Sequence, residues 1–235
     1  MFTDKIILVT GGTGGLGRAV SLAFLEQGAN LIVTWRNDTE LAALKDAAGA
    51  LASRIDAIEA NVADPAVIDQ LFKGIIAKHG RLDAMVNTVG GFGGGSPMWE
   101  TPVEALDRML DVNLRVGFLL SGAAARAMLK QGNGAIVNIA SKAGLSHPAG
   151  LATYSASKAA AIAMIDSLAA DLLGTGVRAN SVLPDIIDTE VNRKAMPNAN
   201  FAKWPKPEAI AKVILFLCSD DASLIHGASI PVYGH

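Results

Sequence analysis

Short apolar runs alternate with segments of helical spacing along the whole chain. The runs that we predict as strands are Lys5–Val9, Asn30–Trp35, Ile55–Ala60, Leu82–Asn87, Ala135–Ala140, Val177–Leu183 and Ser229–Val232. The segments whose apolar residues recur every three or four positions, predicted as helices, are Leu16–Gln27, Thr39–Leu51, Ala66–His79, Val103–Gln131, Thr153–Leu173 and Glu208–Ser219. Most of the strands are apolar throughout, which is typical of parallel strands covered by helices on both faces. The pattern therefore predicts an α/β fold, a single domain over residues 1–235 with a doubly wound parallel sheet of about seven strands.

Two segments depart from this alternation. Gly90–Ser96 follows the fourth predicted strand, and residues 184–207 separate the sixth strand from the last helix. Both begin where a strand ends, which is the edge at which open α/β sheets bind ligands. We expect flexible loops that form the walls of a ligand site, with residues 184–207 as a substrate loop. The alternative is that both segments only connect elements.

Composition narrows the classes of function. The chain is 51% hydrophobic and 18% charged with a net charge of −2, which argues against charge-driven disorder and against a basic surface for nucleic acid. Cys218 is the one cysteine, so no disulfide within the chain is expected, and the four histidines lack the spacing of metal ligands. No uninterrupted apolar run reaches the roughly 18 residues of a membrane span. We expect a cytoplasmic protein with no metal, no nucleic-acid partner and no membrane segment.

A glycine-rich turn follows the first strand and leads directly into a helix. Gly12, Gly14 and Gly17 fit the pattern G-x-G-x-x-G. Without Cβ atoms the backbone N–H groups can approach a pyrophosphate, and the helix N-terminus attracts its negative charge. The motif predicts dinucleotide binding by a Rossmann-type sheet.

Arg36 ends the second predicted strand, where an acidic residue would accept hydrogen bonds from the ribose hydroxyls. An arginine at this place pairs with a 2′-phosphate, so the sequence favours NADP (NADPH) and leaves NAD possible. The alternative is that Arg36 only ends the strand.

A second group of residues has the chemistry of proton transfer. Tyr154 and Lys158 are four positions apart at the start of a predicted helix and share one face. A nearby ammonium lowers the pKa of a phenol, which can then exchange a proton with a substrate oxygen. Ser141, just after the fifth strand, is placed to hydrogen-bond the same oxygen, and Asn113 interrupts an apolar helix. Each has a structural alternative as part of a helix pair, a turn or helix packing.

These motifs resemble the short-chain dehydrogenase/reductase family over nearly the whole chain. The matching positions are Thr10, Gly11, Gly15 and Gly17 for T-G-x-x-x-G-x-G, then Asn61-Val62, Asn87 to Gly90, Asn113, Ser141 and the Y-x-x-x-K pair Tyr154/Lys158. The resemblance implies that Tyr154 is the general acid/base and that Ser141 orients the substrate oxygen. It also implies that Lys158 lowers the tyrosine pKa and holds the nicotinamide ribose, while Asn113 supports a water-linked proton relay.

The cofactor-binding residues implied by the resemblance are Gly11, Thr13, Gly14, Gly15, Leu16, Gly17, Arg36, Asn61, Val62, Asn87, Gly90, Tyr154, Lys158, Pro184 and Thr189. The chain departs from the family at three of these places. Asn61 stands for an aspartate, Asn87-Thr88-Val89-Gly90 stands for N-A-G, and Pro184-Asp185 stands for Pro-Gly. We expect the last change to stiffen the loop that meets the nicotinamide.

The region that faces the substrate has a narrower resemblance. Residues 183–204 and the glycine-aromatic segment around Phe92 are similar to the matching loops of quinonoid dihydropteridine reductases, although that group lacks a serine at the place of Ser141. Phe92, Phe201 and Trp204 are candidates for stacking on a flat or apolar substrate, and His147 for facing it. Each of them also has a simpler explanation as a loop anchor or a solvated turn residue.

Taken together, the sequence predicts an NAD(P)-dependent oxidoreductase, with NADPH-dependent reduction of a carbonyl-type substrate favoured. The alternatives are a dihydropteridine-reductase-like activity and a non-catalytic NADP(H)-binding sensor or scaffold. The family resemblance also implies a homodimer or homotetramer assembled through the two long helices, Val103–Gln131 and Thr153–Leu173.

Overall fold

A computed structural model describes residues 1–234. The described residues form one parallel sheet of seven strands in the order β3-β2-β1-β4-β5-β6-β7. The strands are β1 (Ile6–Thr10), β2 (Asn30–Trp35), β3 (Ile55–Glu59), β4 (Ala84–Asn87), β5 (Gly134–Ile139), β6 (Val177–Pro184) and β7 (Ser229–Val232). Every predicted strand is present with its ends within two residues of the expected ones. The predicted Rossmann-type doubly wound sheet is confirmed.

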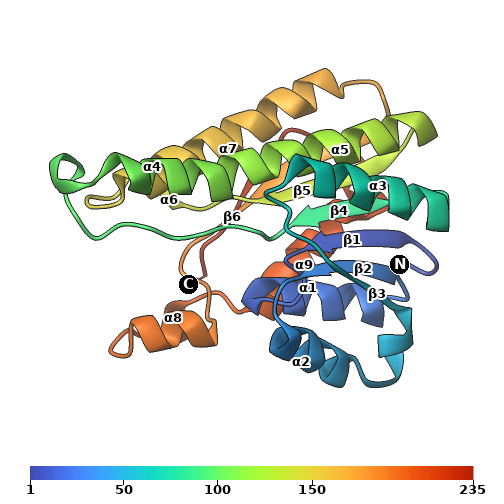
Figure 1. Cartoon of the computed structure of the whole chain (residues 1–235), viewed down its shortest axis with the longest axis horizontal. Coiled ribbons are helices and arrows are strands. Elements are labelled where there is room, and N and C mark those ends of the chain that lie inside the picture. Colours follow the sequence, from blue (N-terminus) through green and yellow to red (C-terminus); the bar gives the residue numbers. More distant parts are fainter. Residues whose placement is uncertain (235) are drawn as a thin grey trace.

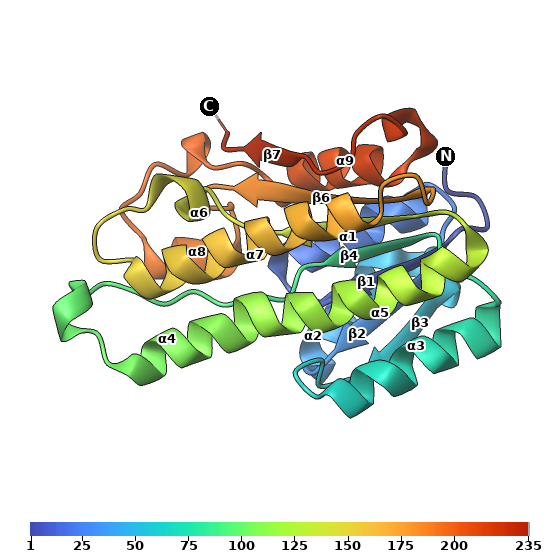
Figure 2. The ribbon, with the colours of Figure 1, turned by 90° about the horizontal axis from the view of Figure 1, so that it is seen from above.

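Helices cover both faces of this sheet. They are α1 (Gly15–Glu26), α2 (Asp38–Ala48), α3 (Pro65–His79), α4 (Val103–Leu110), α5 (Val116–Gln131), α6 (Ala143–Ser146), α7 (Ala152–Asp171), α8 (Glu190–Ala195) and α9 (Pro207–Cys218). Figure 1 shows α3, α5 and α7 above the sheet and α1, α2 and α9 below it. In the view from above, the first three lie side by side (Figure 2). Among residues 1–234 no helix has both the length and the apolarity to cross a membrane.

The apolar core is split into two layers by the sheet. Along β1, Ile7 and Val9 pack with the layer of α1 and α9, whereas Ile6 and Leu8 pack with the layer of α3 and α5. Each of these side chains is at most 6% exposed. Since both faces are covered, successive residues of a strand are buried in turn on opposite sides, which explains the continuous apolar runs.

The long helix predicted over Val103–Gln131 is interrupted. A single π-helical turn, Asp111–Arg115, separates α4 from α5 and carries Asn113 at its centre. The inserted turn shifts the side chains that follow relative to those that precede it, and such turns are frequent at functional sites. The 3.6-residue spacing on either side of the turn is regular, so the pattern predicted one continuous helix.

The substrate loop, which we expected to be flexible, contains regular secondary structure. It contains α8 and a short 3-10 turn, Phe201–Lys203. The carboxylate of Asp188, whose side chain is 2% exposed, pairs with the guanidinium of Arg193 and the ammonium of Lys206. The backbone N–H of Asp188 also donates to the carbonyl of Pro205 at 3.0 Å. The two ends of the loop are therefore tied together; we call the Asp188, Arg193 and Lys206 side chains the loop clasp.

The loop clasp has a predictable dependence on pH. Hydrogen bonds from Arg193 and Lys206 hold the pKa of Asp188 well below its usual range. A carboxylate with a depressed folded pKa stabilises the fold fully above its unfolded pKa of about 3.9, and the stabilisation is lost as the pH falls through the folded value. We therefore expect the loop clasp to be intact at neutral and mildly acidic pH and to open only in strong acid.

Replacing Asp188 by Asn removes the shared charge partner of two cations and should open the substrate loop at pH 7. We expect trypsin cleavage at Arg193 and Lys203 to accelerate by about tenfold or more, because cleavage follows the population of the open loop. Glu190→Gln is the matched control, since it breaks an exposed pair with Lys194 on α8 and should leave the rate nearly unchanged. Equal cleavage rates in Asp188→Asn and the wild type would contradict the role of the clasp.

Candidate active site

The sheet order reverses between β1 and β4, and the glycine turn lies at the carboxyl end of β1 there. The first turn of α1 approaches this strand closely, since a Cβ on Gly17 would lie 2.1 Å from the carbonyl oxygen of Gly11. The Thr88 hydroxyl, at the end of β4, donates to the carbonyls of Thr10 and Gly11 at 2.7 and 3.1 Å. Glycine at position 17 is therefore required by packing as well as by any ligand.

The start of α1 has the properties of an anion site. Its N-cap, Gly14, makes no side-chain hydrogen bond, and the first turn holds no acidic residue. By contrast, Asn37, Asp64 and Thr189 cap α2, α3 and α8 with their side chains. A Cβ on Gly14 would meet nothing closer than 3.7 Å, so the space in front of the helix is open. This arrangement fits the pyrophosphate of a dinucleotide.

A pocket of about 370 Å³ lies beside this turn. Of the predicted cofactor residues, those lining it are Gly11, Thr13, Gly14, Arg36, Asn61, Val62 and Gly90. The other lining residues are Thr34, Trp35, Glu40, Ala60, Ala63, Thr88, Val89, Asp111, Val112 and Val116. The predicted residues from four different strand ends are thus brought together in one cleft.

The remaining predicted cofactor residues do not line this pocket. Leu16 is 8% exposed and packs in the core, and Asn87 is 1% exposed. Asn87 accepts a hydrogen bond from Thr10 Oγ1 and donates one to Asn138 Oδ1, so it joins three neighbouring strands inside the sheet. The Cγ2 atom of Thr189 is 2.9 Å from the position of a Cβ on Gly15, which places the substrate loop against the first turn of α1.

Pro184 holds the edge of the site through its backbone. Its carbonyl accepts the N–H of Lys142 at 2.9 Å, and the ammonium of Lys142 pairs with Asp185 at 2.7 Å. Asp185 therefore connects the loop after β6 to the loop after β5. That Asp185 in place of a glycine stiffens the loop stays a prediction. The Lys142 ammonium also lies 5.0 Å from the ring centre of Tyr233.

Tyr154, Ser141 and Lys158 come together at the ends of β5 and α7. Burial raises the pKa of Tyr154, and a hydrogen bond with the Ser141 hydroxyl opposes that rise. The sequence had led us to expect a lowered pKa because of Lys158, but the Lys158 ammonium lies 5.9 Å from the ring centre and donates to the carbonyl of Ile139. In this structure the effect of desolvation exceeds that of the Ser141 hydrogen bond, so the phenol is protonated near neutral pH.

Lys158 is a buried cation with donors to spare. The residue is 5% exposed, and burial lowers the pKa of its ammonium to about 8. An ammonium has three donors, and among residues 1–234 it finds a hydrogen-bond acceptor at Ile139 O, 3.0 Å away. A Cβ on Gly90 would lie 3.2 Å from its Nζ atom. Since Gly90 also lines the cofactor pocket, the ammonium lies at the inner end of that cleft, where ribose hydroxyls fit its free donors.

Asn113 joins three elements instead of pointing into an open site. Its Oδ1 atom accepts the N–H of Gly91 at 2.9 Å, and its Nδ2 atom donates to the Gly91 carbonyl and to Ser157 Oγ, both at 3.0 Å. Ser157 Oγ in turn donates to the carbonyl of Tyr154 at 2.8 Å. Asn113 thereby connects the glycine segment after β4 to α7, the helix that carries Tyr154 and Lys158.

The candidate substrate residues are divided between two places. Phe92, 70% exposed, contacts the ring of Tyr154 edge-to-face, with the two ring centres 5.1 Å apart, and therefore lies beside the phenol. Phe201 and Trp204 pack on each other at 4.9 Å, and the Arg193 guanidinium stacks on Phe201 at 4.9 Å. These two rings thus anchor the loop clasp. His147 is an exposed residue in left-handed conformation at the end of α6.

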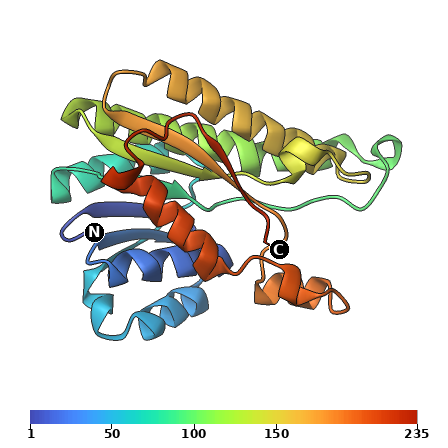
Figure 3. The same cartoon turned by 180° about the vertical axis from the view of Figure 1, so that it is seen from behind.

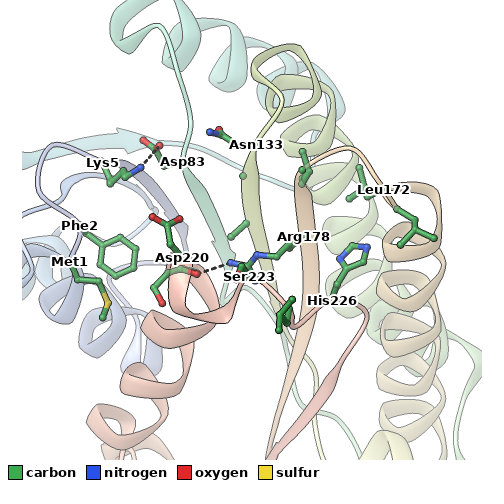
Figure 4. Close-up of a pocket in the computed structure, with 18 of the residues that line it drawn as sticks. Met1, Phe2, Lys5, Asp83, Asn133, Leu172, Arg178, Asp220, Ser223 and His226 are labelled. Carbon is green, nitrogen blue, oxygen red and sulfur yellow. Dashed lines mark hydrogen bonds and ion pairs between the residues drawn. The ribbon is translucent and has the colours of Figure 1, made fainter.

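A different cavity, of about 540 Å³, lies at the edge of the sheet opposite to the glycine turn. Figure 4 shows residues that line it. Its polar groups have partners within the protein. Lys5 pairs with Asp83 at 3.6 Å, Arg178 donates to the carbonyls of Ser219 and Ile225, and His226 bridges two backbone groups. In the back view the N-terminus and one end of α9 lie at this edge, whereas α8 lies toward the other end of the molecule (Figure 3). We do not assign the active site to this cavity.

Three residues of the site were missed by the sequence analysis. Thr88 supports the glycine turn, Ser157 holds Asn113, and Glu40 accepts a hydrogen bond from Thr13 Oγ1 at 3.1 Å at the rim of the pocket. The sequence did contain an indication for Thr88, because a hydroxyl residue stands there in place of the alanine of the family motif. Glu40 and Ser157 carried none, since a helix-surface glutamate and a helix serine are ordinary residues.

Comparisons with known proteins agree with this geometry. Residues 5–200 match the family model described as short chain dehydrogenase. The 3-oxoacyl-[acyl-carrier-protein] reductase FabG of Thermotoga maritima is 33% identical over 98% of this chain and 96% of its own length. The meso-2,3-butanediol dehydrogenase of Serratia marcescens is also 33% identical, over 99% and 94%.

Solved structures agree as well. The structure of ElxO with NADP bound covers 99% of this chain and 98% of its own, with a TM-score of 0.92 and 27% identity. That of NAD⁺-bound xylitol dehydrogenase covers 100% and 99%, with a TM-score of 0.91 and 25% identity. The chain therefore belongs to the short-chain dehydrogenase family of NAD(P)-dependent oxidoreductases.

Proposed function

We propose that this protein reduces a carbonyl-type substrate with NADPH as the favoured cofactor and Tyr154 as the proton donor. The observation that supports this most directly is Gly90, which lines the cofactor pocket and also lies against Lys158 and Asn113. The cleft for the dinucleotide thus ends at the residues that handle protons. Reduced nicotinamide supplies the hydride when bound.

The chain's own residues account for the proton. Tyr154 holds its phenolic proton at neutral pH because burial raises its pKa, and a protonated phenol is the form that donates to an oxygen gaining a hydride. The Ser141 hydroxyl is a second donor for the same oxygen. Lys158, with a pKa of about 8, is placed behind the tyrosine to hold ribose hydroxyls and to return a proton to the phenol. Phe92 covers the position in front of the ring and limits access of water.

NADPH is favoured because Arg36 faces the pocket and offers a bidentate partner for a 2′-phosphate. Named relatives act on different substrates, including 3-oxoacyl thioesters and small diols, so the substrate stays open. The substrate panel should hold a 3-oxoacyl thioester, small ketones and diketones, and a quinonoid dihydropterin. Turnover confined to the pterin would favour the dihydropteridine-reductase-like alternative.

Replacing Tyr154 by Phe should lower the turnover rate of any substrate that the wild type reduces by about 10²–10⁴-fold. NADPH should still bind to this variant. Loss of NADPH absorbance measures the rate, and fluorescence titration measures binding. Phe92→Leu is the control beside it, because it changes the ring contact but not the proton donor. Retained turnover in Tyr154→Phe would contradict the mechanism. A wild type that binds NADPH but reduces nothing in the panel would favour the sensor or scaffold.

The rate of reduction should fall as the pH rises through about 8. The lowered pKa of Lys158 means that its proton is lost about two units earlier than that of an exposed lysine. The value of kcat/KM for NADPH reports ionisations of the free enzyme and is the measurement to follow. In Lys158→Arg, whose guanidinium stays charged, this decline should move above pH 9.5. An unchanged profile in that variant would assign the ionisation to another group.

We also propose that a second copy of the chain packs on α5 and α7. A groove of about 580 Å³ runs between these helices. Its lining residues are Leu110, Asp111, Leu114, Arg115, Phe118, Ser121, Gly122, Met164, Ser167, Leu168 and Asp171. Phe118 is 64% exposed at this groove, and opposite charges there allow a two-fold-related copy to pair with it.

Phe118→Asp should therefore reduce the mass measured by light scattering from that of a dimer or tetramer to that of a monomer. The desolvation of an unpaired carboxylate at the centre of the contact is the physical reason. Leu129→Asp is the matched control, since Leu129 is exposed on α5 but does not line the groove. A monomeric wild type, or an equal effect of both variants, would contradict this interface.

A further inference from the structure

The carboxylate of Glu40 lines the cofactor pocket, whereas the end of β2 contributes Arg36 and no acidic residue. Glu40 lies in the first turn of α2, and its Oε2 atom accepts a hydrogen bond from Thr13 Oγ1 at 3.1 Å. Thr13 is part of the glycine turn and is 4% exposed, so it is a fixed anchor. Asn37 caps α2 by accepting the N–H groups of Thr39 and Glu40. The backbone and the side chain of Glu40 are thus both held.

The carboxylate of Glu40 lies at the start of a helix. A carboxylate in the first turn interacts favourably with the positive end of the helix dipole, and the hydrogen bond from the Thr13 hydroxyl holds its position. Glu40 and Arg36 line the same pocket, together with the glycine turn. The pocket is thus lined by one cation, Arg36, and by two carboxylates, Glu40 and Asp111, of which Glu40 is the one hydrogen-bonded to the glycine turn.

The charges of Arg36 and Glu40 act in opposite directions on the two cofactors. A 2′-phosphate is attracted by Arg36 and repelled by Glu40, whereas the neutral 2′- and 3′-hydroxyls of an unphosphorylated ribose donate well to a carboxylate. We propose that Glu40 is the specificity-determining acceptor of this pocket, which holds the preference for NADPH to a modest ratio and allows NADH to bind. The proposal rests on the proposed function, and Thr13 acts in it as a positioning residue.

Other acidic residues nearby are distinguished from Glu40 by the structure. Asp38 belongs to the same helical turn but does not line the pocket. Asp111 lines the pocket from the π turn, where Val112 and Val116 are its neighbours in the lining. Among the carboxylates of residues 1–234 that line the pocket, Glu40 is the one hydrogen-bonded to the glycine turn, and this bond restrains its position relative to a ribose bound there.

The test uses the adenosine half of the cofactor, so that binding is separated from hydride transfer. Isothermal titration of the full chain with adenosine 2′,5′-bisphosphate and with 5′-ADP gives the two dissociation constants. In Glu40→Gln we expect the bisphosphate to bind about tenfold more tightly, which corresponds to about 1.4 kcal/mol. Binding of 5′-ADP should weaken by a few-fold, because an amide is a poorer acceptor than a carboxylate.

Controls separate this effect from general charge and from folding. Asp38→Asn removes the same charge from the same turn and should leave the ratio of the two constants within about twofold of the wild type, because exposed charges outside the pocket are screened. Thr13→Val keeps the carboxylate but removes its anchor, and should shift the ratio in the direction of Glu40→Gln by a smaller factor. Melting temperatures of all variants check the fold.

The outcomes distinguish this proposal from the NADPH assignment. An unchanged ratio in Glu40→Gln, or an equal shift in Asp38→Asn, would overturn the role of Glu40. Arg36→Gln tests the assignment itself and should weaken the bisphosphate alone; if it does not, the NADPH preference fails whatever Glu40 does. The ratio of kcat/KM for NADPH to that for NADH should rise in Glu40→Gln in parallel with the binding ratio.

Discussion

The approach of the first turn of α1 to the end of β1 is the constraint on which the rest of the site depends. The backbone carbonyl of Gly11 lies so close to Gly17 that no Cβ fits between them, and the Thr88 hydroxyl braces both Thr10 and Gly11 from the neighbouring strand. This contact places an uncapped helix N-terminus at the point where the strand order reverses. That placement accounts for the candidate anion site and for the pocket beside it. It also accounts for the contact between Thr189 and Gly15.

Polar side chains inside the sheet continue this arrangement toward the catalytic end. Thr10, Asn87 and Asn138 occupy one register across β1, β4 and β5 and are joined by hydrogen bonds. Buried polar groups are costly unless they are paired, so this row fixes the register of the strands that carry the site. Asn113 does the same outside the sheet, since it connects the segment after β4 to α7 through Gly91 and Ser157. A rigid frame is what proton transfer between Tyr154, Ser141 and a substrate oxygen requires.

Burial governs the electrostatics of the residues that we propose as catalytic. It raises the pKa of Tyr154 and lowers that of Lys158, which favours a neutral phenol and a lysine that exchanges its proton near pH 8. The charged residues that surround the site act differently, because they are paired at its rim. Asp188 pairs with Arg193 and Lys206 within residues 184–207, and Lys142 pairs with Asp185 to connect the loops after β5 and β6. The loops proposed for substrate recognition are therefore held by charge pairs that their composition does not indicate.

Local patterns in the sequence were enough to predict the strands, the main helices and the residues that we propose for the site. Periodicity is a local property, so seven strands and the helices between them were predictable, and the glycine turn, Arg36, Ser141, Tyr154 and Lys158 each follow from spacing within one or two neighbouring elements. The tertiary structure decided what depends on distant partners. Thr13 and Glu40 are 27 positions apart, and Asn113 and Ser157 are 44 apart. The π turn at Asn113, the raised pKa of Tyr154 and the loop clasp at Asp188 have the same origin, because packing between separate elements sets burial and charge pairing there, and no pattern within a single element records it.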